Sequence, residues 1–358
     1  MTSPAKKQQK KRIHRFGDTQ RRKSVRIARR RRTINVSNDV WLDVFRFVGR
    51  ARLGEKVALL SVRFDALVDK FNEGTKFSIG QLEIQRASSG RKAAAIKKRV
   101  GRKLVPLPFP QTQPPDSIIG FTQINISYID NNVVSFLLHR IKHLFNTDIT
   151  LWLNIGSDQG RCWSVIKTLF WDLMANNCTS MLIDGTSVDV LRTFISPTVF
   201  RDCAKLRSIE IFANDLLPDS PADDQKASAS AGQALSKWLH TPRMDGRPKM
   251  FRSAGPAQLE QNLAELKTAF LNAIIPVNYI VAIVDLALGD DEPFELENGQ
   301  TGERLTYRQV GDVCLLTRSP VRRETQNWAQ WEEEAADWQK TRGKIVEFWI
   351  SDRDLAFV

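Results

Sequence analysis

Apolar residues recur at helical spacing in three short sets between Val36 and Phe71. The first set occupies one wide helical face over residues 40–48, the second begins at Leu53, and the third runs from Leu60 to Phe71. We therefore predict three short helices, which carry more apolar surface than so small a unit can bury alone. Part of that surface needs a partner, either another protein or the following domain.

From about Gly120 the pattern changes to short β-branched runs that alternate with helical patterns. Strands are predicted over residues 149–155, 180–184, 207–212, 248–252 and 279–286. Strands joined by helical crossovers pair in parallel. One segment also matches the pattern of a leucine-rich repeat, with Leu206, Ile209, Ile211 and Asn214 at the expected spacing. The predicted fold class is α/β, and a leucine-rich-repeat-like curved sheet with helical crossovers is favoured over a doubly wound sheet.

The end of the chain has a different pattern. Alternating residues flank Asn298 and Gly299 and predict a hairpin. An amphipathic helix is predicted over residues 322–339, followed by a closing strand over residues 344–352. Core packing is the default for Trp328, Trp331 and Trp338 on this helix, with a substrate-capturing groove as the alternative.

Positive charge is concentrated at the N-terminus. The sequence has 53 Lys and Arg against 40 Asp and Glu, and residues 1–32 hold 14 of these basic residues with one acid, Asp18. The other 39 basic and 39 acidic residues balance, so the net charge of +13 belongs to the tail. This balance argues against a generally basic nucleic-acid-binding body. Apart from the segment after residue 86, the folded part is expected to have no second basic surface.

The tail has few large apolar residues and is predicted to be disordered. Its basic clusters resemble a bipartite nuclear-import signal, which would make an importin a partner. The same charge could bind nucleic-acid phosphates without sequence preference or adhere to acidic membrane surfaces, and a solubilising tail is the remaining alternative. We favour nuclear import through these residues: Lys10, Lys11, Arg12, Arg21, Arg22, Lys23, Arg29, Arg30, Arg31 and Arg32.

The segment after the helical patterns is predicted to be a linker. Residues 86–103 contain eight basic residues and no acid, and five prolines follow up to Pro115. Prolines at this density favour an extended spacer. The predicted domains are therefore a disordered basic tail (1–32), a helical module (33–85), a basic and proline-rich linker (86–117) and an α/β domain (118–358).

Few residues suggest catalysis or metal binding. The four cysteines are widely spaced, as expected for reduced and buried thiols in an intracellular protein. His139 and His143 have the spacing of a zinc pair, but Arg140 stands where a zinc protease motif has glutamate. Glu55 replaces the lysine of a near P-loop at residues 49–56. We expect no catalytic residues, no metal and no cofactor.

The longest apolar stretch, residues 273–288, is interrupted by Pro276, Asn278 and Asp285. It falls short of the roughly 20 residues that span a bilayer. We therefore expect an intracellular protein, located in the nucleus, the cytoplasm or both, with no membrane partner.

The block Val36–Val68 resembles an F-box, a helical module that joins a protein to a cullin-type ubiquitin ligase. Asp39 matches the acidic position of the family pattern, and Ser61 matches the position of its cysteine. Ser37 stands where the family has proline, and Trp41 where it usually has leucine. The rest of the chain resembles the expanded F-box families of nematodes.

The resemblance implies a non-catalytic adaptor that docks a Skp-family linker protein, and through it a cullin, while the α/β domain binds a protein substrate. The docking residues that it implies are Val36, Val40, Trp41, Val44, Phe45, Val48, Leu53, Leu60, Phe64 and Leu67. We expect Phe45→Asp to abolish docking and to leave the α/β domain folded. The alternative is a nuclear protein that binds nucleic acid or chromatin through its tail, with the helical module serving only a structural role. No pattern indicates where a substrate would bind.

Overall fold

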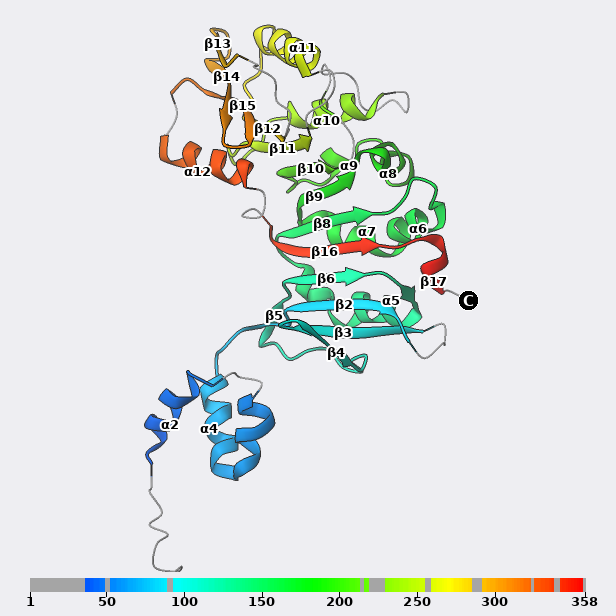
Figure 1. The fold of residues 1–358 in the computed structure, drawn as a ribbon, viewed down its shortest axis with the longest axis vertical. Helices are drawn as coiled ribbons and strands as arrows, with labels where there is room; N and C mark the ends of the chain where they lie inside the picture. Colours follow the sequence, from blue (N-terminus) through cyan, green and yellow to red (C-terminus); the bar gives the residue numbers. More distant parts are fainter. Residues whose placement is uncertain are drawn as a thin grey trace, which may run out of the picture. The chain divides into compact units, whose positions relative to one another are not determined.

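The structure is a computed structural model (Figure 1), and it describes residues 36–48, 52–88, 93–212, 216–218, 229–254, 259–284, 292–322, 325–337 and 342–356. The chain divides into two compact units, Met1–Thr75 and Lys76–Val358. The described part of the first unit is helical, whereas the second unit combines a large sheet with several helices. The α/β class predicted from the sequence is confirmed at this level.

Short helices form the described part of the first unit. They are α2 (Asn38–Phe45), the π turn η1 (Leu53–Val57), the 3-10 turn η2 (Ala58–Leu60) and α4 (Val62–Asn72). Ser61 caps α4, because its hydroxyl accepts a hydrogen bond from the backbone N–H of Phe64. The buried core of this unit consists of Phe45, Leu53, Leu67 and Val68.

A thirteen-stranded sheet dominates the described part of the second unit. Eight neighbouring strands run parallel: β12 (Tyr279–Val284), β11 (Lys249–Ala254), β10 (Ser208–Phe212), β9 (Cys178–Asp184), β8 (Ile149–Asn154), β16 (Lys344–Trp349), β6 (Gln123–Ile126) and β2 (Gln81–Arg86). Antiparallel strands extend the sheet at both ends: β15 (Val313–Pro320), β14 (Glu303–Val310) and β13 (Phe294–Asn298) beyond β12, and β3 (Ala94–Val100) and β4 (Lys103–Leu107) beyond β2. Two small parallel sheets pair β1 (Phe77–Ser78) with β5 (Ile118–Gly120) and β7 (Ile129–Asp130) with β17 (Leu355–Ala356).

The helices between the parallel strands cover one face of the sheet. They are α5 (Asn131–Ser135), η3 (Phe136–Arg140), η4 (Lys142–Phe145), α6 (Gly160–Val165), η5 (Ile166–Phe170), α7 (Trp171–Met174), η6 (Ala175–Asn177), η7 (Gly185–Ser187), α8 (Val188–Phe194), α9 (Val199–Asp202), α10 (Ala231–Leu239) and α11 (Leu259–Leu271). Their apolar side chains join strand residues such as Leu151 and Leu153 in the main core. α12 (Thr325–Ala336) packs on the opposite face, where Trp328 lies in a second core with Met250 and Ile280.

Away from α12, the opposite face of the sheet is more polar and less covered. Glu83 of β2, Asn125 of β6 and Trp152 of β8 point to this face and are half-buried. Registered neighbours Leu182 of β9 and Glu210 of β10 continue the same row. We call this side of β2, β6, β16, β8, β9 and β10 the open face.

β16 lies between β6 and β8, although about 190 residues of chain separate β8 from β16. Val346 pairs in register with Ile124 on one side and with Leu151 on the other. Gly343 precedes the strand, and a Cβ at this position would lie 2.1 Å from the carbonyl oxygen of Asp148. The close approach of these two backbones therefore requires glycine.

The prediction of a linker over residues 86–117 is wrong where β3 and β4 form a hairpin of the large sheet. Ile96 is buried in the main core, and Arg99 forms an ion pair with Glu83 of β2. Pairing with β2 and the burial of Ile96 thus outweigh the density of positive charge. Pro106 is tolerated because β4 is the edge strand.

The boundary between the units also differs from the prediction. The helical module was predicted to extend to residue 85, but β1 and β2 belong to the second unit, which begins at Lys76. Ile84 of β2 is fully buried in the main core of that unit. The strands predicted over 149–155, 180–184, 207–212, 248–252 and 279–286 are confirmed as β8 to β12, and the predicted hairpin, helix and closing strand as β13 with β14, α12 and β16.

Candidate docking surface and basic pocket

The ten docking residues implied by the F-box resemblance occupy three environments. Phe45, Leu53 and Leu67 are core residues, and each is no more than 4% exposed. Val36, Trp41, Val48 and Phe64 are half-buried. Val40, Val44 and Leu60 are exposed. The last group is the most accessible to a partner.

Three further apolar side chains of the first unit are exposed and were not among the predicted docking residues. Phe47, Leu59 and Val62 are 90%, 80% and 88% exposed. Together with Val40, Val44 and Leu60 they form a set that we call the exposed apolar residues. A pattern in the sequence indicates three of them, because α2 and the turn after it have apolar residues on two sides. Trp41 and Phe45 face the core, whereas Val40, Val44 and Phe47 follow at i, i+4 and i+7.

The two departures from the F-box pattern have distinct structural roles. Ser37 precedes α2 with φ −62° and ψ 157°, and its side chain makes no capping hydrogen bond. This φ is the one that proline adopts. Trp41 packs edge-on against Phe64, with ring centroids 4.9 Å apart. The larger ring therefore contributes to the packing between α2 and α4.

A basic pocket of about 440 Å³ lies in the second unit, where the parallel strands β8 to β11 begin. Its lining comprises Asp148, Thr179, Ser180, Lys205, Arg207, Ser208, Arg243, Arg247, Met250, Arg342 and Gly343. Five of these side chains are cationic and one is acidic. The expectation that the folded part has no second basic surface is therefore wrong.

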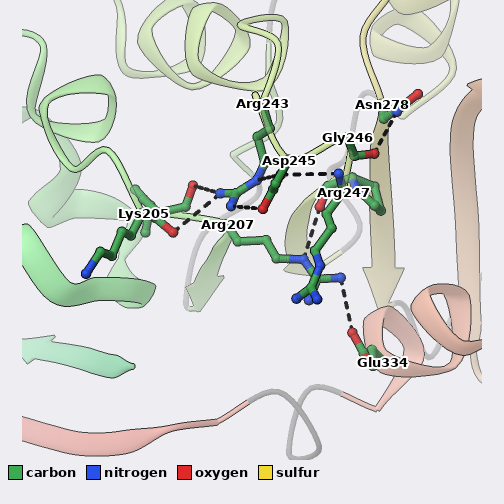
Figure 2. A network of polar contacts seen from close by, with 10 residues as sticks. Lys205, Arg207, Arg243, Asp245, Gly246, Arg247, Asn278 and Glu334 are labelled. Carbon is green, nitrogen blue, oxygen red and sulfur yellow. Dashed lines mark hydrogen bonds and ion pairs between the residues drawn. The ribbon is translucent and has the colours of Figure 1, made fainter. Parts of the chain in front are cut away.

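The turn between α10 and β11 is held rigidly beside this pocket (Figure 2). Nε and Nη2 of Arg243 donate to the two carboxylate oxygens of Asp245 at 2.9 and 2.6 Å. Nη1 of Arg243 donates to the carbonyl oxygen of Leu206 at 3.2 Å. The hydrogen bond from Arg243 lowers the pKa of Asp245. Oδ1 of Asp245 also accepts a hydrogen bond from the backbone N–H of Arg247 at 3.2 Å. This bond fixes the backbone at Arg247.

Arg207 directly precedes β10, and its charge is partly neutralised by Glu334. Its Nη2 donates to Oε2 of Glu334 on α12 at 3.1 Å, and its Nε donates to the carbonyl oxygen of Pro248 at 3.2 Å. Burial lowers the pKa of Arg207, Glu334 opposes this shift, and Arg247 and Arg243 add repulsion. The positive charges of the pocket therefore disfavour one another.

Arg247 and Arg342 complete the cationic lining. The guanidinium of Arg247 has no hydrogen-bond or ion-pair partner among the described residues. Arg342 lies over the ring of Trp152, 5.5 Å from its centroid, and burial lowers the pKa of Arg342. Guanidinium groups, Lys205 and the hydroxyls of the lining offer hydrogen-bond donors suited to an oxyanion.

The sequence contains a weak signal for this pocket. Basic residues occur at or shortly before the start of three predicted strands: Lys205 and Arg207, Arg247, and Arg342. Because parallel strands begin at the same edge of a sheet, these segments meet there. These basic residues lie far apart in the sequence, so a search for local clusters of charge did not find them.

The histidines and cysteines considered in the sequence do not line the basic pocket. His139 and His143 lie in the short turns η3 and η4, and no three metal-ligating side chains cluster among the described residues. All four cysteines are buried. Burial raises the pKa of the Cys162 thiol, and the hydrogen bond and negative charge of Asp352 raise it further, so this thiol is not activated.

Core packing is confirmed for Trp328, which is 4% exposed, and Trp331 is half-buried beside it. Trp338 and the ten tail residues assigned to nuclear import lie outside the described residues. No described helix is both long enough and apolar enough to cross a membrane.

Comparison of the chain with protein-family models, with curated proteins and with solved structures gave no match.

Proposed function

We propose that this protein is a non-catalytic adaptor that docks a Skp-family linker protein, and through it a cullin ubiquitin ligase, with its helical unit. The observation that carries the proposal is the set of exposed apolar residues on a unit with a four-residue core. Phe47 and Val62 are almost completely exposed, and such side chains in one small helical unit are typical of a surface that a partner covers. The F-box resemblance of Val36–Val68 supplies the identity of that partner.

The sheet unit would bind the target protein, and its architecture supports this role. Consecutive parallel strands from β8 to β12 lie side by side with their connecting helices on one face, as a leucine-rich-repeat-like curved sheet would have them. The open face then provides the binding surface. It carries Trp152 in edge-on contact with Phe212, and Trp349 is 62% exposed. Aromatic side chains of this kind often dominate binding energy at protein interfaces.

The test measures the affinity of the full chain for a purified Skp-family linker at moderate salt. Phe47→Asp and Leu60→Asp are expected to weaken binding by about tenfold or more each, because each places a charge in an apolar contact. Ile274→Asp is the matched control, since Ile274 is also an exposed apolar residue, 76% exposed, but lies in the second unit.

Phe45→Asp is not suited to this test. The side chain of Phe45 is 1% exposed and contacts Phe71 at a centroid distance of 5.7 Å, so a charge there would disrupt the core and mimic a loss of docking. Binding that persists in both Phe47→Asp and Leu60→Asp would show that the helical unit does not dock a linker through these residues.

The alternative function is nucleic-acid or chromatin binding through the basic tail. It predicts a different dependence of binding affinity on salt concentration. Binding through phosphates falls steeply between low and moderate salt, whereas an apolar contact persists. Because the tail carries the whole net charge of +13, deletion of residues 1–32 would abolish nucleic-acid binding and leave linker binding unchanged.

A further inference from the structure

A second, smaller pocket of the sheet unit contains a buried lysine. It has a volume of about 260 Å³, lies between α9, the turn after α10 and the start of β11, and shares Arg243 with the basic pocket. Its walls combine apolar and cationic side chains, among them Phe200, Leu206, Trp238, Arg201, Arg243 and Lys249. We call it the lysine pocket.

Lys249 is an unusual residue to find in such a place. It is 5% exposed, and no carboxylate forms an ion pair with it among the described residues. Its side-chain nitrogen donates to the carbonyl oxygen of Trp238 in the last turn of α10 and lies 5.0 Å from the centroid of the Trp238 ring. A buried charge without an anion is unfavourable for folding, and groups of this kind are typical of functional sites.

The charges around Lys249 favour its neutral form. Burial, and repulsion first from Arg243 and then from Arg201, lower the pKa of Lys249 to about 7. Asp245, the carboxylate of the pocket, is bonded to Arg243. His240 follows α10 and adds no charge at neutral pH, because burial lowers its pKa to about 4. A large share of the Lys249 side chains therefore carries a free amine at neutral pH.

A free amine at this position is able to react. A neutral amine has two N–H groups and one lone pair, so it can donate to the Trp238 carbonyl and still present its lone pair to the pocket. Desolvation and neighbouring cations are the two means by which proteins activate a lysine as a nucleophile. Lys249 has both.

We propose that Lys249 binds a small 2-oxo acid as a covalent imine. The amine lone pair attacks the carbonyl carbon, a proton passes from nitrogen to the former carbonyl oxygen, and loss of water leaves a C=N double bond. The step needs no oxidant or reductant, and addition of water reverses it. This binding site adds to the proposed adaptor function and does not depend on it.

The walls of the lysine pocket select the class of carbonyl compound. The carboxylate of a 2-oxo acid lies next to its carbonyl carbon, so it would be held near Arg201 and Arg243, whose charges otherwise repel the lysine. Phe200, Leu206 and Trp238 suit a short apolar substituent on the other side of the carbonyl. A volume of about 260 Å³ limits the ligand to a small molecule.

The experiment incubates the full chain with pyruvate and sodium cyanoborohydride, which reduces an imine to a stable secondary amine. Peptide mass spectrometry then locates the adduct. At pH 7 Lys249 should be modified at least about tenfold faster than the exposed Lys103, because an ordinary lysine is almost fully protonated at this pH. The ratio of the two rates should fall as the pH rises from 7 to 9.5.

Arg201→Gln tests the contact with the carboxylate. Pyruvate and propanal are compared as probes, since both form an imine and only pyruvate carries a carboxylate. Loss of repulsion from Arg201 changes the amine equally for both probes, so the ratio of their rates isolates the carboxylate contact. This ratio should fall about tenfold, as expected for one charge-assisted contact. Arg102→Gln removes the same charge from an exposed turn of the same unit and should leave the ratio unchanged.

Lys249→Met provides a second readout, because it removes the amine and replaces a buried charge with an apolar side chain. Pyruvate without the reductant should raise the melting temperature of the wild-type protein and not that of this variant.

Three results would overturn the proposal. Modification of Lys249 no faster than that of Lys103 would show that Lys249 only caps α10. An equal effect of Arg201→Gln on pyruvate and propanal would exclude recognition of a carboxylate. An equal rise in melting temperature in Lys249→Met would place pyruvate at another site.

Discussion

Phe45 and Phe47 are two residues apart and have opposite roles: one is buried in the core of the helical unit, and the other is almost fully exposed. Both occupy apolar positions in the sequence pattern, and the spacing alone did not separate them. The same holds for Leu60, which is exposed, and Leu67, which is buried. Sequence periodicity identified the segment correctly, but the division between core and surface depends on the packing of helices against one another.

Lys249 is a buried lysine that lowers the stability of the folded chain, which the sequence did not indicate. The residue begins β11, is 5% exposed, and its ammonium group donates to the carbonyl oxygen of Trp238. Burial, with repulsion from Arg243 and Arg201, lowers the pKa of Lys249 to about 7 from a usual value of 10.5. The unfolded chain therefore binds this proton more tightly than the folded chain does between these two pH values.

We predict that Lys249→Met stabilises the sheet unit, and that the stabilisation is largest at pH 7 and below. As the pH falls from 10.5 toward 7, the wild-type protein loses up to about 1.4 kcal/mol of stability per pH unit relative to the variant, and below pH 7 the difference stays constant. Urea unfolding of both proteins at pH 6.5, 8 and 9.5 measures this. Lys103→Met, at an exposed lysine, is the control, and a difference between Lys249→Met and wild type that does not vary with pH would contradict the prediction.

At the scale of elements, local patterns predicted which segments form strands but not where each strand lies in the sheet. The parallel strands β8 to β12 follow from β-branched runs alternating with helical patterns. β3 was missed, because the density of basic residues and the prolines after it suggested a linker, whereas Ile96 pairs with Ile84 of β2 and is buried. The position of β16 between β6 and β8 was not predictable either, since strand order depends on pairings between distant segments.

We predict that Gly343→Ala destabilises the sheet unit by about 2–4 kcal/mol, because the new methyl group would lie 2.1 Å from the carbonyl oxygen of Asp148 and would force apart the starts of β8 and β16. Gly299→Ala is the matched control, since nothing lies within 4 Å of the added atom. Urea unfolding compares the two variants, and hydrogen exchange should show the loss of protection in β16 and β8. Equal stability of both variants would be the contrary result.

At the scale of the whole molecule, the basic pocket shows why sites are harder to predict than folds. Each of its cationic segments is unremarkable by itself, and the overall charge of the chain after the tail is balanced. Only the parallel topology brings Arg207, Arg247 and Arg342 to one edge of the sheet. The apolar helical segment between Val36 and Phe71, by contrast, is local in sequence and could be located without coordinates.

The division at Thr75 and Lys76 leads to a prediction about independent folding. The main core is formed within the second unit, so residues 76–358 should fold alone and unfold cooperatively. Their melting temperature should lie within about 3 °C of that of the sheet transition in the full chain. Calorimetry of both proteins tests this, and a fragment without a cooperative transition would show that the helical unit is required for the sheet to form.

The place of β16 has a consequence for how the protein is made. During synthesis β6 and β8 leave the ribosome long before β16, so the nascent sheet has two facing strand edges that no segment yet fills. Such edges pair readily with strands of other chains. Cells would therefore need to protect the unfinished chain until residues 344–349 are translated, and a premature stop codon anywhere upstream would leave the sheet split at its centre.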